Sequence, residues 1–489
     1  TTKPLDFPDG SDYASSTLYQ QYKRTEYENR YLSYYMTASY SYDNRYTVFG
    51  SMRFDGSNLF GVSDKYKYLP LWALSAAWNV DQERFMDNAE WVSSLKLRLS
   101  YGLQGNVDKN TSPYIVGTWG ETSGLGDSSE PTITVTSPPN QKLRWEKTSN
   151  WNLGVDMGVL NNRITFSVDG YYRKSKDLIG VRSLPLENGF DFTSMNWAQV
   201  TNKGFEFTIS TVNVRTQNFR WAMDFNIAHN KSNVDRITIR ENERMPSLQG
   251  YSVGAVFKLN TAGVDENGYQ MFWKDGQKVS LKDFFALDYS SEGLPTSTLT
   301  NEEYSKLFTY AGTTEPKFTG GFINKFYYKN FDLTISTSFV IDQTMQESPF
   351  YSPSGMSPGT NYSKRVADIW SPSNPNGIYP RIMNHSYWMD PDNDFIYTWM
   401  DDTNAGFKNY DYWFKDMSYL RVNSIRLGYT LPDNVLKKLG FGAARISVEA
   451  RNPFVIASSY KGYFDPETWG NVYTQPLPRT FSCGIDLTF

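Results

Sequence analysis

The sequence predicts an all-β protein, and three observations favour a transmembrane antiparallel β-barrel. The first is a strict two-residue alternation of apolar and polar residues in about thirteen segments. The second is the length of these segments, because a tilted strand needs about 9–12 residues to cross a bilayer. The third is that short and long connections alternate along the chain, as they do on the two sides of an outer-membrane barrel.

The alternation is clearest in the last ten residues, TFSCGIDLTF. Phe481, Cys483, Ile485 and the following apolar positions are expected to face lipid, while the polar set lines the barrel interior. The same pattern predicts strands at residues 31–42, 45–55, 68–80, 94–105, 145–158, 163–174, 197–212, 218–230, 318–328, 331–341, 419–431, 444–454 and 479–489.

The connections give the barrel an orientation. Short turns are expected on the periplasmic side, and long extracellular loops at about residues 107–143, 175–195, 231–317, 342–415 and 455–477. If the last strand ends at the periplasm, the first strand runs inward and Thr1 lies in an extracellular loop. An odd number of strands cannot close an antiparallel barrel of this kind, so we expect this chain to be a piece of a longer one.

The composition excludes several classes of function. Aromatic residues make up 16% of the 489 residues, which suits the aromatic belts of a membrane protein. A net charge of -4 gives no basic surface for nucleic acid, and one cysteine excludes an internal disulfide framework. No apolar run is long enough for a transmembrane helix. No nucleophile elbow, phosphate loop or carboxylate pair stands out, so no enzyme and no cofactor is predicted.

One acidic stretch, MDPDNDF, has the spacing of a calcium loop. Asp390, Asp392, Asp394 and Asp401 would be its ligands. Phe395 stands where such a loop needs glycine, and Asp401 replaces the usual glutamate. A solvated acidic loop without metal is therefore favoured.

Several segments resemble one family, the SusC/RagA-like TonB-dependent transporters of Bacteroidetes outer membranes. They include RFDGSNLFG at Arg53, WVSSLKLRLSYGLQGN at Trp91, VTNKGFEF at Val200, YLRVNSIRLGYTLP at Tyr419 and PLPRTFSCGIDLTF at the end. The segment LRWEKTSNWNLGVDMGVLNNRITFSVDGYYRKSKDL shows the same likeness. The similarity follows the family's order along almost the whole chain and is weakest in the long loops.

The resemblance implies a plugged barrel of 22 strands, of which residues 1–489 supply the C-terminal part; the plug domain, the TonB box and the first strands are absent. It implies TonB-dependent import of a bulky nutrient across the outer membrane of a Gram-negative bacterium. A SusD-like surface lipoprotein would cap the loops, and TonB would act through the absent plug. Oligosaccharides are favoured over peptides. The rivals are a soluble β-rich glycan-binding protein or hydrolase, and a passive porin.

Three groups of candidate residues follow from these expectations. Phe489 is expected to act as a terminal signal for barrel assembly, as the resemblance implies, or only as an aromatic belt residue. Loop tryptophans, and tyrosines such as Tyr351, Tyr362, Tyr387 and Tyr463, either pack the loops or contact ligand or lid; the tryptophans are Trp119, Trp273, Trp370, Trp388, Trp399, Trp413 and Trp469. Charged residues expected to face the lumen, where they pair with the plug or the solvent, are Lys96, Arg98, Asp156, Asp169, Arg426, Glu449 and Arg451.

Overall fold

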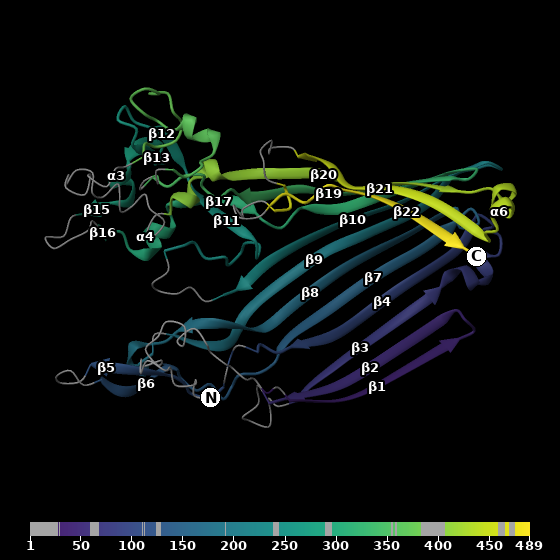
Figure 1. Ribbon diagram of the computed structural model, residues 1–489. Helices are drawn as coiled ribbons and strands as arrows, with labels where there is room; N and C mark the ends of the chain where they lie inside the picture. The colour runs from purple at the N-terminus through teal and green to yellow at the C-terminus, as the bar shows by residue number, and fades with distance from the viewer. Residues whose placement is uncertain are drawn as a thin grey trace, which may run out of the picture.

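The chain forms one large antiparallel sheet with folded insertions at one end (Figure 1). The computed structural model describes residues 28, 30–58, 68–109, 111, 113–123, 129–190, 192–237, 244–288, 296–353, 356, 359–382, 406–457, 465–468 and 475–489. Within these residues, no helix is both long enough and apolar enough to cross a membrane.

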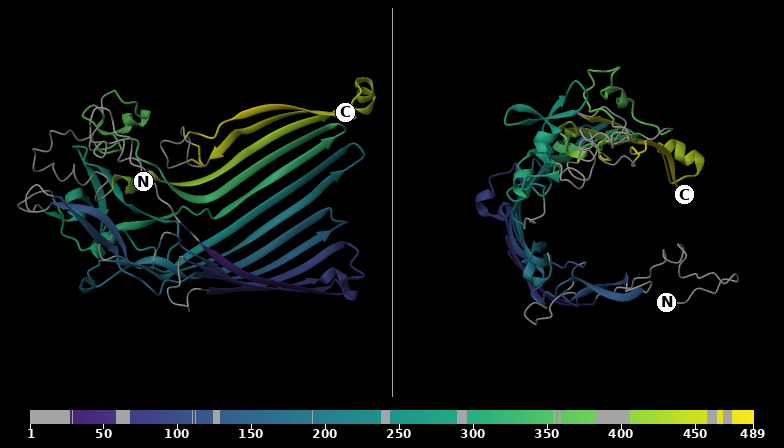
Figure 2. Two further views of the ribbon diagram at one scale, coloured as in Figure 1. Left: turned by 60° about the horizontal axis from the view of Figure 1, so that its bottom comes forward. Right: turned by 90° about the vertical axis from the view of Figure 1, so that its left-hand side faces the viewer.

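The main sheet has thirteen strands in chain order, each paired antiparallel with its neighbours. The strands are β1 Tyr31–Tyr42, β2 Tyr46–Ser57, β3 Tyr68–Asn79, β4 Val92–Asn106, β7 Glu146–Val159, β8 Ile164–Ser183, β9 Phe192–Arg215, β10 Phe219–Arg236, β18 Phe318–Tyr328, β19 Phe331–Gln346, β20 Phe414–Thr430, β21 Ala443–Ala457 and β22 Thr480–Thr488. The thirteen strands predicted from the alternation are thus confirmed. The sheet curves into an open arc with β1 and β22 at its edges (Figure 2).

The predicted long loop at residues 175–195 is wrong, because β8 and β9 extend through most of it. Only residues 184–191 connect the two strands, and they include the short 3-10 helix η4 Leu186–Asn188. The pairing of β8 with β9 shifts register between Ser175 and Ile179, and Asp177 has a φ of 58°. This irregularity breaks the two-residue period, so the alternation ends before the strand does.

Short connections gather at one end of the sheet, which we call the turn end. They include the 3-10 helices η2 Val80–Gln82 and η3 Arg84–Met86 and the helix α6 Asp433–Leu439. A short one joins β1 to β2, where Asp43 and Asn44 both have positive φ. That conformation is typical of a two-residue hairpin turn whose twist matches that of the strands.

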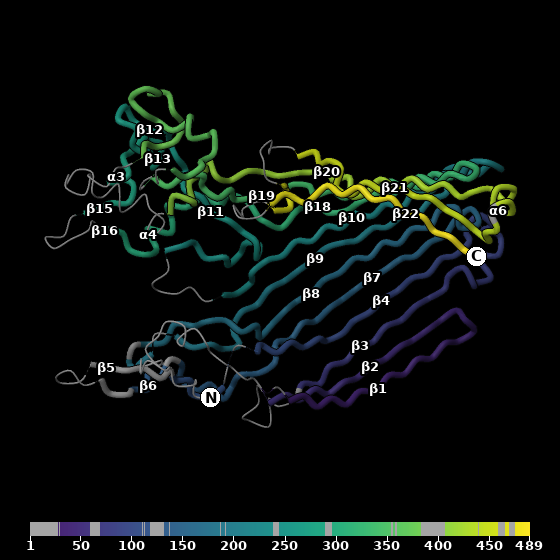
Figure 3. Tube along the Cα trace, viewed as in Figure 1, coloured from purple at the N-terminus to yellow at the C-terminus, as the bar shows by residue number. Residues whose placement is uncertain are grey.

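Long connections gather at the opposite end, which we call the loop end, as the tube in Figure 3 shows. One carries the hairpin of β5 Val116–Ser123 and β6 Ser129–Ser137. The β10–β18 connection carries β11 Ala255–Leu259, β12 Thr261–Val264, β13 Gln270–Lys274, β14 Gln277–Ser280, α3 Leu281–Phe285, β15 Leu287–Asp288, β16 Thr296–Ser297, α4 Asn301–Ser305 and β17 Phe308–Thr313. The β19–β20 connection carries the 3-10 helices η5 Lys364–Asp368, η7 Phe407–Asn409 and η8 Asp411–Trp413.

The β10–β18 and β19–β20 connections fold together into what we call the loop module, residues 244–288, 296–317, 347–353, 359–382 and 406–413. A parallel bridge joins Leu259 to Tyr410, and the Thr261 hydroxyl donates to Asp411 at 2.5 Å. Their shared apolar core includes Phe272 and Phe284 from the first connection and Trp413 from the second. The hydrophobic core of the described chain therefore sits mainly beyond the end of the sheet.

Candidate functional site

One face of the sheet carries all seven charged residues that the sequence assigns to the lumen. Directly paired residues in an antiparallel sheet point to the same face. Lys96 pairs with Asp156, and Arg98 is linked to Asp169 through Gly154. Following the paired residues from β8 through β9, β10, β18 and β19 leads to the same face of β20 and β21. There Arg426 pairs with Glu449, and Ser424 pairs with Arg451. We call this surface the polar face.

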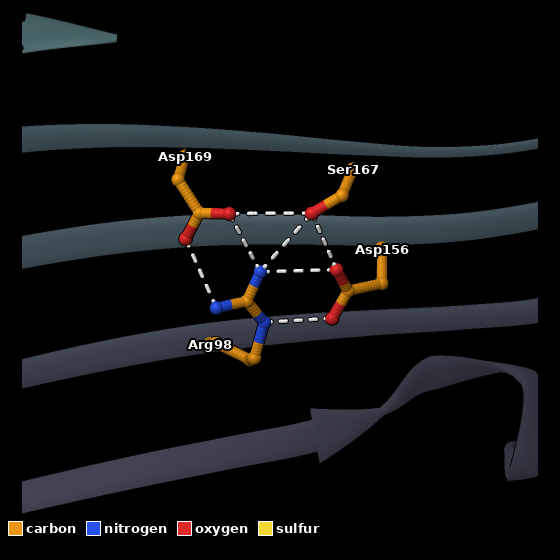
Figure 4. A network of polar contacts seen from close by, with 4 residues as sticks. All are labelled: Arg98, Asp156, Ser167 and Asp169. Carbon is orange, nitrogen blue, oxygen red and sulfur yellow. Dashed lines mark hydrogen bonds and ion pairs between the residues drawn. The ribbon is translucent and has the colours of Figure 1, made fainter. Parts of the chain in front are cut away.

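A dense network on the polar face joins three neighbouring strands (Figure 4). The Arg98 guanidinium donates from Nε to Asp156 at 2.6 Å and from Nη1 to Asp169 at 2.9 Å. The Ser167 hydroxyl donates to Asp156 at 2.7 Å. One cation thus holds two carboxylates that would otherwise repel each other, in the forked geometry that arginine favours.

Glycine in the middle strand makes this pairing possible. A Cβ atom at Gly154 would lie 2.6 Å from the Arg98 Cζ atom and 2.7 Å from an Asp169 oxygen. The same arrangement recurs at Gly428, over which Arg445 reaches Asp332 with a contact of 2.6 Å. In both places an arginine crosses an intervening strand because that strand offers no side chain.

The most deeply buried ion pair ties a loop segment to the polar face. Arg421 of β20 is 3% exposed and pairs with Asp465 and, at 2.6 Å, with Glu467. Arg421 pairs in register with Ser338, which lies on the polar face of β19. The segment 465–468 of the β21–β22 connection therefore lies against the polar face near the loop end.

The loop module places the described tryptophans in different settings. Trp413 is fully buried and stacks on Tyr379, with ring centroids 5.5 Å apart and an interplanar angle of 9°. Trp370 is buried beneath Arg381, whose guanidinium lies 5.3 Å from the ring centroid. Trp273 is 46% exposed on β13. Packing thus accounts for Trp413 and Trp370, whereas Trp273 is half-exposed, with the Lys278 ammonium 5.7 Å from its ring centroid.

Two tyrosines in the loop module are shielded from water. Tyr351 and Tyr410 are buried, and burial raises the pKa of both phenols well above the usual range. The Tyr351 hydroxyl donates to the Pro380 carbonyl at 2.8 Å, and Tyr362 is only partly buried. Both phenols are therefore neutral and shielded from a ligand, and the Tyr410 hydroxyl has no hydrogen-bond partner among the described residues.

Other candidate residues lie outside the described part of the chain or at its margins. Asp390, Asp392, Asp394, Asp401, Trp388, Trp399, Trp469, Tyr387 and Tyr463 lie outside the described residues. Trp119 lies on β5, opposite Ile133. Phe489 is 90% exposed, and its ring centroid lies 5.3 Å from that of Phe441. No group of three or more His, Cys, Asp or Glu side chains within the described ranges could hold a metal.

Sequence reasoning missed several pairings on the polar face. The predicted lumen residues did not include Asp332, Arg445, Asp224 or Lys325, yet Lys325 pairs with Asp224 at 2.8 Å across β10 and β18. The signal that could have revealed the three-strand pairs is the mid-strand glycine between an arginine and an aspartate. The Arg421 pairs carry no such signal, since their partners lie in a loop.

The opposite face of the sheet is apolar, and no part of the described chain packs against it. Leu99, Leu153, Val168 and Ile485 are exposed along it, although each sits in a well-paired strand. A sheet of membrane-spanning strand length with one exposed apolar face and one charged face is the wall of a transmembrane β-barrel.

Comparison with known proteins identifies the kind of barrel. The family model described as "TonB dependent receptor-like, beta-barrel" matches residues 2–453, and the chain belongs to this family. It is 28% identical over 485 residues to the TonB-dependent receptor SusC of Bacteroides thetaiotaomicron, covering 94% of this chain and 44% of the relative. It is 27% identical over 509 residues to the TonB-dependent receptor P3 of Formosa agariphila, covering 94% of this chain and 46% of the relative.

Solved structures support the same fold. The RagAB peptide transporter matches with a TM-score of 0.71 at 22% identity, covering 94% of this chain and 48% of that chain. The RagAB peptide importer in its "open-open" state also matches with a TM-score of 0.71, at 21% identity. The chain thus spans about half the length of the relatives it matches, and the expected resemblance to SusC/RagA-like transporters is confirmed.

Proposed function

We propose that this chain forms the C-terminal part of the wall of a TonB-dependent outer-membrane transporter that imports a bulky nutrient. The observation that carries this proposal is the two-faced, thirteen-stranded sheet of the receptor-barrel family. Its apolar face would meet lipid, and its polar face would line the passage. The loop end would then be extracellular and the turn end periplasmic.

The proposed role of the polar face is structural support for a gated passage. Lys96, Arg98, Asp156, Asp169, Arg426, Glu449 and Arg451 would solvate the interior and contact a plug supplied by the N-terminal part of the same transporter. Arg98 is already engaged by two carboxylates, so it is better suited to hold the wall than to bind substrate. TonB would act through that plug, and no catalytic step is proposed.

The proposed role of the loop module is capture at the cell surface, with a SusD-like lipoprotein as its lid. Trp273 offers an exposed ring for a sugar or for the lid, which Trp413 and Trp370 do not. The substrate class favoured is an oligosaccharide. A peptide is the second candidate, because the chain resembles the RagAB peptide transporter in fold.

Deleting the gene for the transporter tests this function directly. The deletion strain should lose growth on at least one defined glycan or peptide pool and regain it when the gene is restored. The protein should fractionate with the outer membrane and migrate differently on a detergent gel with and without heating. Partition into the soluble fraction without detergent would contradict the barrel, and growth unchanged on every pool would contradict import. Energy-independent uptake would instead favour a passive porin.

A further inference from the structure

A cavity of about 490 Å³ opens at the loop end, where the approach to β7 packs beside the β8–β9 hairpin. Pro138, Pro139 and Pro185 form a rigid apolar part of its lining, while Arg182, Ser183 and Thr193 contribute polar groups. The two sides are tied together by the Asn140 side-chain amide, which donates to the Ser194 carbonyl at 2.9 Å. The cavity is therefore built by two segments that are distant in sequence.

Among the described residues, Arg182 is the only charged one that lines this cavity. Its guanidinium lies 4.7 Å from the centroid of the Trp197 ring. The Arg236 guanidinium lies 4.3 Å from the same ring, and its Nε atom donates to the Trp197 carbonyl at 2.9 Å. Neither arginine forms an ion pair with a carboxylate within the described part of the chain. One indole thus holds two guanidinium groups, and no acid in the described ranges forms an ion pair with either of them.

Two hydroxyl groups that line the cavity are also available. Within the described residues, the side-chain hydroxyls of Ser183 and Thr193 make no hydrogen bond. Glu187 is exposed on the hairpin but does not line the cavity and forms no ion pair there. Stacking on Trp197 restricts the Arg182 side chain before any ligand arrives, which lowers the entropic cost of binding.

We propose that this cavity is a subsite for a carboxylate group of the imported nutrient. A guanidinium presents a planar fork that matches a carboxylate, and the two hydroxyls can donate to its oxygens. The proline wall offers a rigid apolar surface to the carbon skeleton that carries the acid. A uronic acid in an oligosaccharide and an acidic residue in a peptide share this chemistry. The inference rests on the proposed import function and specifies the substrate as acidic.

Binding by the complete transporter, purified in detergent, tests the subsite. The probes are hexagalacturonate, a hexaglutamate peptide and the neutral maltohexaose, measured by calorimetry at low and high salt. Arg182→Ala should weaken binding of the acidic probe about tenfold or more, as expected for a hydrogen-bonded charge. Arg182→Lys should recover only part of the loss. Arg215→Ala is the matched control, because Arg215 is exposed at the turn end of β9.

The acidic probe that binds identifies the source of the carboxylate. Equal affinity of wild type and Arg182→Ala overturns the subsite, as does equal loss in Arg215→Ala. Wild-type binding of maltohexaose as tight as that of the acidic probes, or binding of neither acidic probe, also overturns it.

A growth assay separates this inference from the proposed function. If the gene deletion abolishes growth on a nutrient but Arg182→Ala cells grow on acidic nutrients as wild type does, the import function is supported and the carboxylate subsite is refuted. If the deletion does not change growth on any nutrient, the proposed import function itself is refuted. Arg182→Ala cells that fail on acidic nutrients but grow on neutral ones, with normal transporter levels, support both.

Discussion

The barrel wall and the loop module bury their apolar residues in opposite ways. In the wall, Leu153 is 59% exposed although it lies in the middle of β7. In the loop module, Trp413 is completely buried among Phe350, Tyr379 and other rings. Within the described ranges the wall therefore has no protein core behind its apolar face, whereas the module has a core of its own.

This difference shows which solvent each region is built for. A backbone paired in strands can expose apolar side chains where lipid replaces water. A loop surrounded by water must bury its apolar groups against one another, which is what the two connections do by folding together. The wall should thus depend on the membrane, and the module on its own packing.

Removing the centre of the module should have the largest effect. Trp413→Ala should destabilise the module by about 3–5 kcal/mol, because a large buried side chain leaves a cavity. The Trp413 Nε1 atom has no hydrogen-bond partner within the described residues, so the substitution removes packing contacts. Limited proteolysis should cut the module much faster, while the heat-modifiable gel mobility of the barrel is unchanged. Trp273→Ala is the exposed control, and equal sensitivity of both variants would refute the separate core.

A charge on the apolar face should break the wall and spare the module. Leu153→Lys should destabilise the barrel by about 2–4 kcal/mol if the residue lies near the middle of the bilayer. Asn152→Lys, one residue earlier on the polar face, should have little effect. Urea unfolding of the transporter in lipid vesicles measures both. Equal costs for the two variants would mean that the apolar face does not meet lipid.

Alkaline pH should weaken the module before the wall. Burial raises the pKa of Tyr351 and Tyr410 above that of the unfolded chain, which is about 10. Their stabilisation is therefore complete below about pH 10 and is lost as the pH rises through the folded values. Each unit above pH 10 should cost about 1.4 kcal/mol per tyrosine. Proteolysis rates from pH 9 to 11 measure this, and Tyr351→Phe should flatten the profile.

Breaking the charged network on the polar face should have the smallest effect on stability. Arg98→Ala leaves Asp156 and Asp169 unpaired, but all three side chains are partly exposed, so the cost should be about 1 kcal/mol or less. Lys96→Ala is the control on the same strand. Unfolding in lipid vesicles at low and high salt measures the difference. A loss of several kcal/mol would show that this network supports the wall as strongly as the apolar face does.

The sequence could predict the wall because the alternation in each strand is a local property. Leu95, Leu97 and Leu99 alternate with Lys96 and Arg98, and this pattern alone fixes the strand and its two faces. The prediction failed where Asp177 interrupts the period, and it left open whether the loop aromatics pack together, which they do in a core shared by two loops. Trp413 and Trp273 are both loop tryptophans in the sequence, and nothing local distinguishes the buried ring from the exposed one.

The sequence by itself therefore determined the strands, which face of each strand is apolar, and the family, since each depends on residues close together in the chain. The tertiary structure decided which distant groups meet. It brought Arg421 to Asp465, set Arg98 across Gly154, and placed Arg182 beside a proline wall from another connection. These contacts depend on register and loop packing, which connect residues that no periodic pattern relates.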